Sequence, residues 1–212
     1  EAPAYFIAKY PVTNAQFQAF VDAPDGYHNA AWWSAIEKHM GASRPAAWRE
    51  PNAPRERVSW FEAIAFARWA NETVVKPHSD WIIGLPSDAE WRQAYTLDGD
   101  DYPWEGEPDP IKHANVGGSV GRTSVVGLFP GGASVSNALD MAGNVRAGRW
   151  DLHANLGNTS ISDDTGFDHA RVLRGGSWGG LSYFLRASYR GRNQPVFRGD
   201  LVGFRVLCRP HR

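Results

Sequence analysis

The sequence predicts a single α+β domain that is rich in loops, with short strands and two or three helices. The candidate helices precede the candidate strands along the chain, which is an α+β order. Between residues 96 and 132, Gly, Pro, Asn and Asp recur every few positions, which indicates ordered loop with a few strands, such as 124–126. Ten tryptophans in 212 residues predict a fold organised by large aromatic anchors instead of long helices.

Three helices are expected, and each begins at a hydroxyl side chain that can cap its first turn. In the second and third helices a glutamate stands three positions after the cap, which is the pattern of a capping box. The expected helices span residues 13–21, 59–71 and 87–95. Two strands are expected at 170–173 and 203–207, where short apolar runs are flanked by glycine or polar residues.

The charge balance argues against two classes of partner. The 22 basic and 23 acidic residues give a formal net charge of −1, which favours neither a nucleic-acid surface nor a membrane-attracting face. The longest apolar runs, such as 63–66, are far too short to cross a bilayer. Cys208 is the one cysteine, so no disulfide can form within the chain. This cysteine usage slightly favours a reducing compartment such as the cytoplasm.

Seven short motifs are spread over nearly the whole chain. They occupy residues 9–14, 57–60, 85–91, 102–104, 140–145, 171–178 and 203–206. In this order they resemble the formylglycine-generating enzyme (sulfatase-modifying factor) family. The resemblance implies that family's elaborated C-type lectin-like fold, with residues 1–212 forming one domain. The tryptophans expected to anchor the core are Trp60, Trp69, Trp91 and Trp178. The glycines expected to serve tight backbone geometry are Gly175, Gly176 and Gly203.

The enzyme that the chain resembles uses two cysteines with copper, because soft sulfur ligands hold Cu(I) well. The matching positions here are Ser182 and Ala187, and neither can supply a thiolate. A related iron enzyme, which makes sulfur–histidine compounds, needs an additional helical domain that carries histidines. The seven histidines of this chain show no metal-ligand spacing. We therefore expect that the chain is not an enzyme and has no catalytic residues.

The resemblance also implies a structural calcium, held in part by the glutamate of a Trp-Glu-Trp sequence. Residues 146–148 occupy those places, and Ala147 replaces the glutamate, which removes an oxygen ligand. We therefore expect no metal and no cofactor, and the family's calcium site is put in question. A nearby acidic cluster of Asp163, Asp164 and Asp168 has the oxygen ligands to bind a cation, but it is interpreted as a solvated loop because nothing in the sequence fixes its geometry.

Residues 178–203 closely resemble the variable region of diversity-generating-retroelement proteins. In those systems a reverse transcriptase copies a template rich in asparagine codons and substitutes at adenines. The fixed framework of the pattern is Trp178, Leu185, Arg186, Arg190, Arg192, Pro195, Arg198, Gly203, Phe204 and Arg205. The positions expected to vary and to bind ligand are Gly179, Gly180, Leu181, Tyr183, Phe184, Tyr189, Gly191, Asn193, Gln194, Phe197, Gly199, Asp200 and Leu201.

Composition supports this interpretation over drift of a degenerate active site. An AAC codon mutated at its adenines yields Gly, Leu, Tyr, Phe, Asp or Asn, and every expected variable residue except Gln194 obeys that restriction. Drift would also introduce Lys and Glu, and neither occurs between residues 178 and 203.

The interpretation predicts a non-catalytic binding protein whose ligand, a protein or other macromolecule, differs between variants. Tyrosine and phenylalanine offer rigid contact area, while Gly and Asn adapt, as in antibody loops. The arginines expected to brace the segment are Arg186, Arg190, Arg192 and Arg198. Two alternatives remain open, namely an oxidase like the formylglycine-generating enzyme and a sensor or effector domain of a larger signalling protein.

Overall fold

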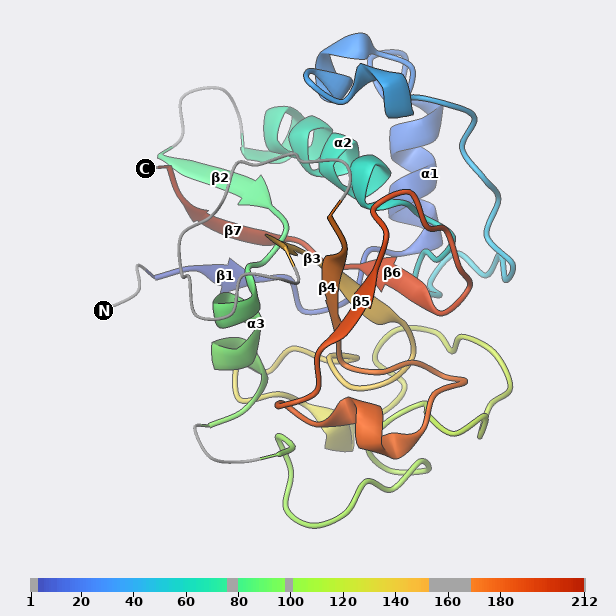
Figure 1. Cartoon of the computed structure of the whole chain (residues 1–212), viewed down its shortest axis with the longest axis vertical. Coiled ribbons are helices and arrows are strands. Elements are labelled where there is room, and N and C mark those ends of the chain that lie inside the picture. The colour runs from blue at the N-terminus through green and yellow to red at the C-terminus, as the bar shows by residue number, and fades with distance from the viewer. Residues whose placement is uncertain (1–3, 76–79, 98–100, 153–168, 212) are drawn as a thin grey trace.

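The computed structural model describes residues 4–75, 80–97, 101–152 and 169–211, and Figure 1 shows the arrangement. Helices α1 and α2 lie at one end of the molecule, two small sheets cross its middle, and long loops with short 3-10 helices fill the other end. The acidic cluster of Asp163, Asp164 and Asp168 lies outside the described residues. Among the helices of those four ranges, none is both long and apolar enough to traverse a bilayer.

The three predicted helices are confirmed. They are α1 (Asn14–Asp22), α2 (Trp60–Ala70) and α3 (Asp88–Tyr95). Each starts at its expected hydroxyl cap, and all three have complete capping boxes, including α1, where Gln16 replaces the glutamate. A π-helical turn, Asn71–Val75, follows α2. The short 3-10 helices are η1 (Ala30–Trp33), η2 (Glu37–His39), η4 (Pro130–Gly132) and η5 (Ser182–Leu185).

Within the described residues, seven short strands form two sheets. They are β1 (Phe6–Ile7), β2 (Trp81–Gly84), β3 (Arg146–Leu152), β4 (Arg171–Arg174), β5 (Gly191–Asn193), β6 (Val202–Phe204) and β7 (Leu207–Pro210). One sheet has the antiparallel order β1-β7-β2, and the other has the order β5-β4-β3-β6, in which β3 and β6 are parallel. The predicted strand at 170–173 is confirmed as β4, and Cys208 lies in the last strand.

Two strand predictions are wrong. The expected strand 203–207 is split between β6 in one sheet and β7 in the other, because Arg205 stands at the crossing. Its buried guanidinium donates hydrogen bonds to the carbonyls of Ala8 and Leu139, and these bonds hold the chain where it passes from one sheet to the other. Residues 124–126 form no strand, because their amides bond to loop groups at Asn52 and Asn144.

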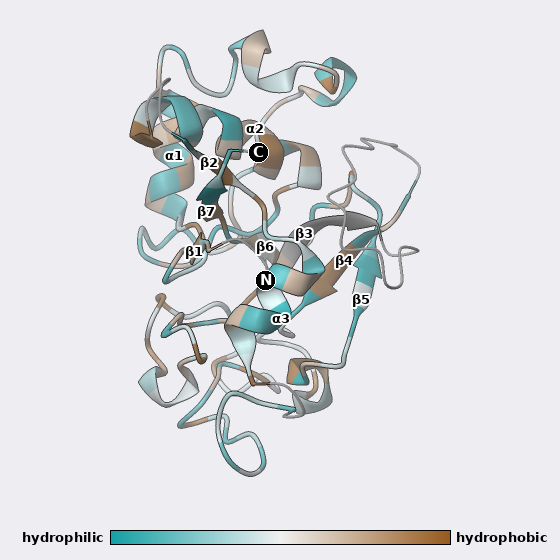
Figure 2. Ribbon diagram, turned by 90° about the vertical axis from the view of Figure 1, so that its left-hand side faces the viewer, coloured by the Kyte–Doolittle hydropathy of each residue, from teal (hydrophilic) through white to brown (hydrophobic). Residues whose placement is uncertain are grey.

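In the part of the chain that the structure describes, two apolar clusters make the core. Phe17, Phe20, Phe66 and Phe204 belong to the first cluster, between the first two helices and the sheets, and Trp91 belongs to the second cluster, beside η5. Figure 2 shows β4 as apolar between its neighbours and β5 as hydrophilic, which fits a buried strand beside a surface strand. Of the four expected tryptophan anchors, Trp60 and Trp91 are buried, whereas Trp69 and Trp178 are partly exposed.

Candidate ligand-binding surface

The backbone of residues 178–203 is held by groups outside that segment. Figure 1 shows the chain leaving β4, passing through η5 and returning as β5 beside β4. In the first half, carbonyls accept hydrogen bonds from amides of the 117–118 loop and from the Tyr95 hydroxyl, which bonds the Leu185 carbonyl at 2.7 Å. The amide of Ala187 donates to the Asp101 carbonyl at 2.8 Å.

The second half is held in the same way. The amide of Trp60, the first residue of α2, donates to the Pro195 carbonyl at 3.0 Å. The amide of Arg57 donates to the Gly199 carbonyl at 3.1 Å, and that of Arg146 donates to the Leu201 carbonyl at 2.8 Å. All these bonds use main-chain groups of the segment, so they do not depend on which side chains the segment carries.

A buried arginine joins the segment to α3. The side chain of Arg174 is 2% exposed, and it donates to both carboxylate oxygens of Asp88 at 2.7 Å. Its Nη1 donates to the carbonyls of Ala187 and Tyr189 at 2.6 and 2.7 Å. Charge-assisted, two-point pairing of this kind fixes geometry as well as adding stability. Sequence reasoning placed Arg174 in a motif but missed this anchoring role.

Three of the four arginines expected to brace the segment make such contacts. Arg190 pairs with Asp88 at 3.3 Å. Arg198 pairs with the fully buried Glu62 at 2.8 Å and donates to a loop carbonyl. Arg186 lies near the Asp101 carboxylate, at 3.7 Å, and donates to a tyrosine hydroxyl. The fourth, Arg192, is exposed on β5.

Eleven of the thirteen expected variable residues are exposed or half-buried. Leu181, Tyr183 and Phe197 are 68%, 54% and 44% exposed, although each is large and apolar or aromatic. The two buried members, Gly180 and Gly191, are glycines. The buried framework residues are Leu185, Pro195, Gly203, Phe204 and Arg205. The structure therefore brings the expected variable side chains to the surface, and their role in binding stays a prediction.

The glycines separate into the same two groups. Gly179, Gly180, Gly191 and Gly199, all expected to vary, have backbone angles that any residue adopts. A β-carbon would meet nothing closer than 3.3 Å at the first three of these positions. At Gly199 it would lie 2.5 Å from the ring of Phe197, whose side chain is exposed and can move.

Two of the glycines expected to serve tight backbone geometry, Gly175 and Gly203, behave in the opposite way. Gly175 has φ +83°, in the left-handed region that side chains disfavour. A β-carbon at Gly203 would lie 2.7 Å from the Arg55 carbonyl oxygen and 2.8 Å from Val145 Cγ2. The backbone therefore requires glycine at positions 175 and 203, whereas it does not require glycine at the four expected variable positions.

Three aromatic residues form a cluster on the exposed side of η5. The ring centroids of Phe184 and Tyr189 are 4.7 Å apart, and that of Tyr183 lies 6.0 and 5.7 Å from the two. Arg146 places its guanidinium 5.0 Å from the Phe184 ring, and Arg186 lies 5.1 Å from the Tyr183 ring. Sequence reasoning missed Arg146 as part of this surface. The sequence signal that could have found it is that Arg146 stands where the resembled family carries tryptophan.

The positions that carry catalytic cysteines in the resembled enzyme lie in this segment. Ser182 is exposed at the start of η5, and Ala187 is buried. Cys208 is half-buried on β7, and burial raises the pKa of its thiol, which disfavours a reactive thiolate. Ala147, at the calcium ligand position, lies in β3 and pairs with Arg174 and Gly203. Within the four described ranges, no three His, Cys, Asp or Glu side chains gather as a metal site.

We expect alanine substitutions to separate the two kinds of glycine. Gly191→Ala should keep the free energy of unfolding within about 0.5 kcal/mol of the parent value or raise it slightly, because the backbone angles at residue 191 suit alanine. Gly203→Ala should cost about 1–3 kcal/mol, because its β-carbon overlaps a neighbouring backbone. Urea unfolding of the two variants measures the difference. Equal losses at both sites would show that the segment is as constrained at its variable positions as at its framework.

Comparison with known proteins supports the fold. The chain is similar to the structure of Treponema denticola variable protein 1, with a TM-score of 0.69, 24% identity, and coverage of 97% of this chain and 84% of that one. This likeness shows the fold alone. Together with the helices and sheets described above, it confirms the predicted α+β fold of the C-type lectin-like, formylglycine-generating-enzyme type.

The curated relatives correct the expectation that the chain is not an enzyme. Hercynine oxygenase of Mycolicibacterium thermoresistibile is 31% identical over 97% of this chain and 51% of its own length. Formylglycine-generating enzyme of Thermomonospora curvata is 28% identical over 97% of this chain and 82% of its own length. The absence of thiols at Ser182 and Ala187 argues only against oxidation by a copper–thiolate site. It does not argue against other activities, and one of the relatives is named as an oxygenase.

The chain spans about half the length of the hercynine oxygenases that it matches. The match to a domain family is more complete, since it covers residues 1–210. The chain belongs to the sulfatase-modifying factor enzyme 1-like domain family.

Proposed function

We propose that this chain is a ligand-binding protein in which residues 178–203 present exchangeable side chains on a fixed scaffold, as in the variable proteins of diversity-generating retroelements. The observation that carries the proposal is the division of that segment into two sets. The thirteen expected variable positions are surface side chains or glycines with unrestricted backbone angles. Many of the framework positions are buried or bonded. Varying the first set would leave the fold in place.

The scaffold supports this division, because the main chain of the segment is anchored by main-chain bonds and by Arg174. A binding surface of this kind is preorganised, so little conformational entropy is lost when a partner docks. The fold shared with a Treponema protein whose name describes it as variable is consistent with the proposal.

The chemistry of the surface favours a protein ligand. Tyr183, Phe184 and Tyr189 form a compact aromatic cluster with the guanidinium groups of Arg146 and Arg186 at its edges. Tyrosine and arginine are enriched among the residues that contribute most to protein–protein binding. They are rigid or preorganised, so they offer contact area at low entropic cost.

Display libraries test both halves of the proposal. One library randomises the thirteen variable positions, and the control library randomises the ten framework positions from Trp178 to Arg205. We expect most clones of the first library to resist proteolysis like the parent, and most clones of the second to lose resistance. Binders selected from the first library on a folded protein target should lose about 30-fold or more in affinity when a central aromatic residue is replaced by alanine. Similar loss of folding in both libraries would contradict the proposal.

The genome gives an independent test of diversification. We expect a near-copy of the coding segment for residues 178–203 beside a reverse-transcriptase gene, with differences at adenines. Sequencing of this locus across a population should show substitutions concentrated in the thirteen variable codons. A locus with neither the copy nor the polymerase gene would end the retroelement proposal, while binding by the surface would still be measurable.

A second candidate function is favoured by one observation, the 29–31% identity to hercynine oxygenases over 97% of this chain. In this case the chain would be the domain that completes an oxygenase, and the other half of the protein would come from residues beyond those given or from a partner. Hercynine-dependent oxygen consumption by the full-length gene product would support it. If the folded protein consumes no oxygen with hercynine, the oxygenase candidate is wrong and the ligand-binding proposal stands alone.

A further inference from the structure

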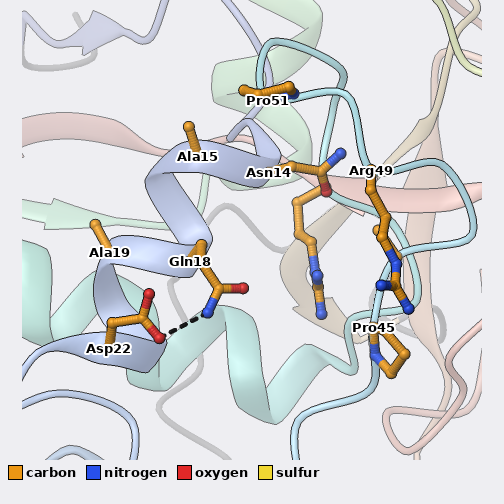
Figure 3. A pocket seen from close by; sticks show the side chains of 10 residues that line it. Asn14, Ala15, Gln18, Ala19, Asp22, Pro45, Arg49 and Pro51 are labelled. Atoms are coloured by element: carbon orange, nitrogen blue, oxygen red, sulfur yellow. Dashed lines mark hydrogen bonds between the residues drawn. The ribbon is translucent and has the colours of Figure 1, made fainter.

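A groove that is separate from the variable segment lies between α1 and the loop that follows η2. Its volume is about 510 Å³, within the range of about 300–1,000 Å³ usual for ligand pockets. Figure 3 shows Asn14 and Gln18 of the helix on one side and Arg49 of the loop on the other. None of its lining residues comes from 178–203, and Figure 1 places α1 and η5 at opposite ends of the molecule. The groove therefore requires its own explanation.

Asn14 presents a buried hydrogen-bond acceptor to this groove. The residue is 8% exposed, and its Nδ2 donates to the carbonyls of Trp48 and Glu50 at 2.8 and 3.0 Å. These two bonds fix the orientation of the amide, so Oδ1 faces away from them. No donor from the described part of the chain reaches this buried oxygen. Since an unsatisfied buried acceptor is costly, the position suits a ligand that supplies an N–H group.

Two guanidinium groups face the same groove. Arg49 is exposed, whereas Arg55 is 5% exposed, donates to the Arg44 carbonyl, and has a buried Nε that bonds no acceptor among the described residues. Across those residues, neither arginine has a carboxylate oxygen within 4.0 Å. Burial lowers the pKa of Arg55, and Glu56 and Glu62 oppose this from farther away. An anion in the groove would stabilise both cations.

The groove is electrically asymmetric along the helix. Its carboxylate, Asp22, stands eight residues after Asn14, about 12 Å along the axis. Gln18 Nε2 donates to this carboxylate at 2.7 Å. The positive end of the helix dipole lies at Asn14, on the same side as the two arginines. A negative group is therefore favoured at one end of the groove only.

We propose that this groove binds the C-terminal end of a peptide. The terminal carboxylate pairs with Arg49 and Arg55, for which arginine forks are well suited. The amide N–H that precedes it donates to Asn14 Oδ1, so one ligand satisfies both the cations and the orphan acceptor. Capture of a terminal carboxylate is a recurring mode of peptide recognition. Ala15 and Ala19 leave space above the helix for the preceding peptide residues.

Fluorescence anisotropy with a dye-labelled tetra-alanine peptide tests the proposal. We expect the peptide with a free C-terminal carboxylate to bind, and the same peptide with a C-terminal carboxamide to bind at least about tenfold more weakly, because it loses charge-assisted hydrogen bonds. Arg49→Gln should weaken binding of the free acid by about tenfold. Arg49 is exposed, so this variant keeps the fold.

Arg44→Gln is the matched control, since Arg44 is also exposed but does not line the groove. It should bind the peptide like the parent chain. Equal affinity for acid and carboxamide, equal effects of the two substitutions, or no binding of the acid would each overturn the proposal. So would full competition by inorganic phosphate at the peptide's own affinity, because the groove would then recognise any anion. None of these outcomes bears on the surface formed by residues 178–203.

Discussion

The structure depends on holding one long segment by its main chain and by a few framework side chains, and not by the side chains that are expected to vary. Arg174 is central to this, because its buried guanidinium joins the Asp88 carboxylate at the start of α3 to two carbonyls of the segment. Removing one partner of such a buried pair typically costs about 3–5 kcal/mol, since the other charge is left without compensation. Carbonyls and amides from the surrounding loops complete the attachment. These bonds do not involve the side chains that are expected to vary, so the path of residues 178–203 does not depend on them.

This arrangement separates the residues that keep the fold from those of the binding surface that we propose. Residues that keep the fold, such as Leu185 and Gly203, are buried or sterically confined. Residues that face solvent, such as Tyr183 and Phe197, do not pack in the core, so their replacement changes the free energy of unfolding little. Enzymes also hold their reactive groups on a rigid scaffold, so that the fold does not depend on those groups. Membership of a family with named enzymes is therefore compatible with a binding surface on the same scaffold.

The sequence was sufficient to predict elements that are set by interactions between residues close together along the chain. The capping patterns at Ser59 and Ser87 predicted α2 and α3, because a cap and its glutamate act within one turn. The motif pattern also predicted the surface placement of eleven of the thirteen positions expected to vary, while Gly180 and Gly191 are buried. Sequence could not show that this apolar run divides between two sheets at Arg205, since the carbonyl partners of its guanidinium lie far away along the chain. The groove at Asn14 escaped prediction because its two walls are distant in sequence. The inference from Ser182 and Ala187 to a protein without activity went further than two missing thiols allow.

The most direct test is a crystal structure of a variant in which all thirteen variable positions carry new side chains and the framework is unchanged. If the main chain is held as described, residues 178–203 will superpose on the parent within about 1 Å, which is no more than the backbone of a preorganised interface moves on binding, and the Arg174–Asp88 pair will be intact. A rearranged or unfolded segment would show instead that its path depends on the side chains that we assign to recognition.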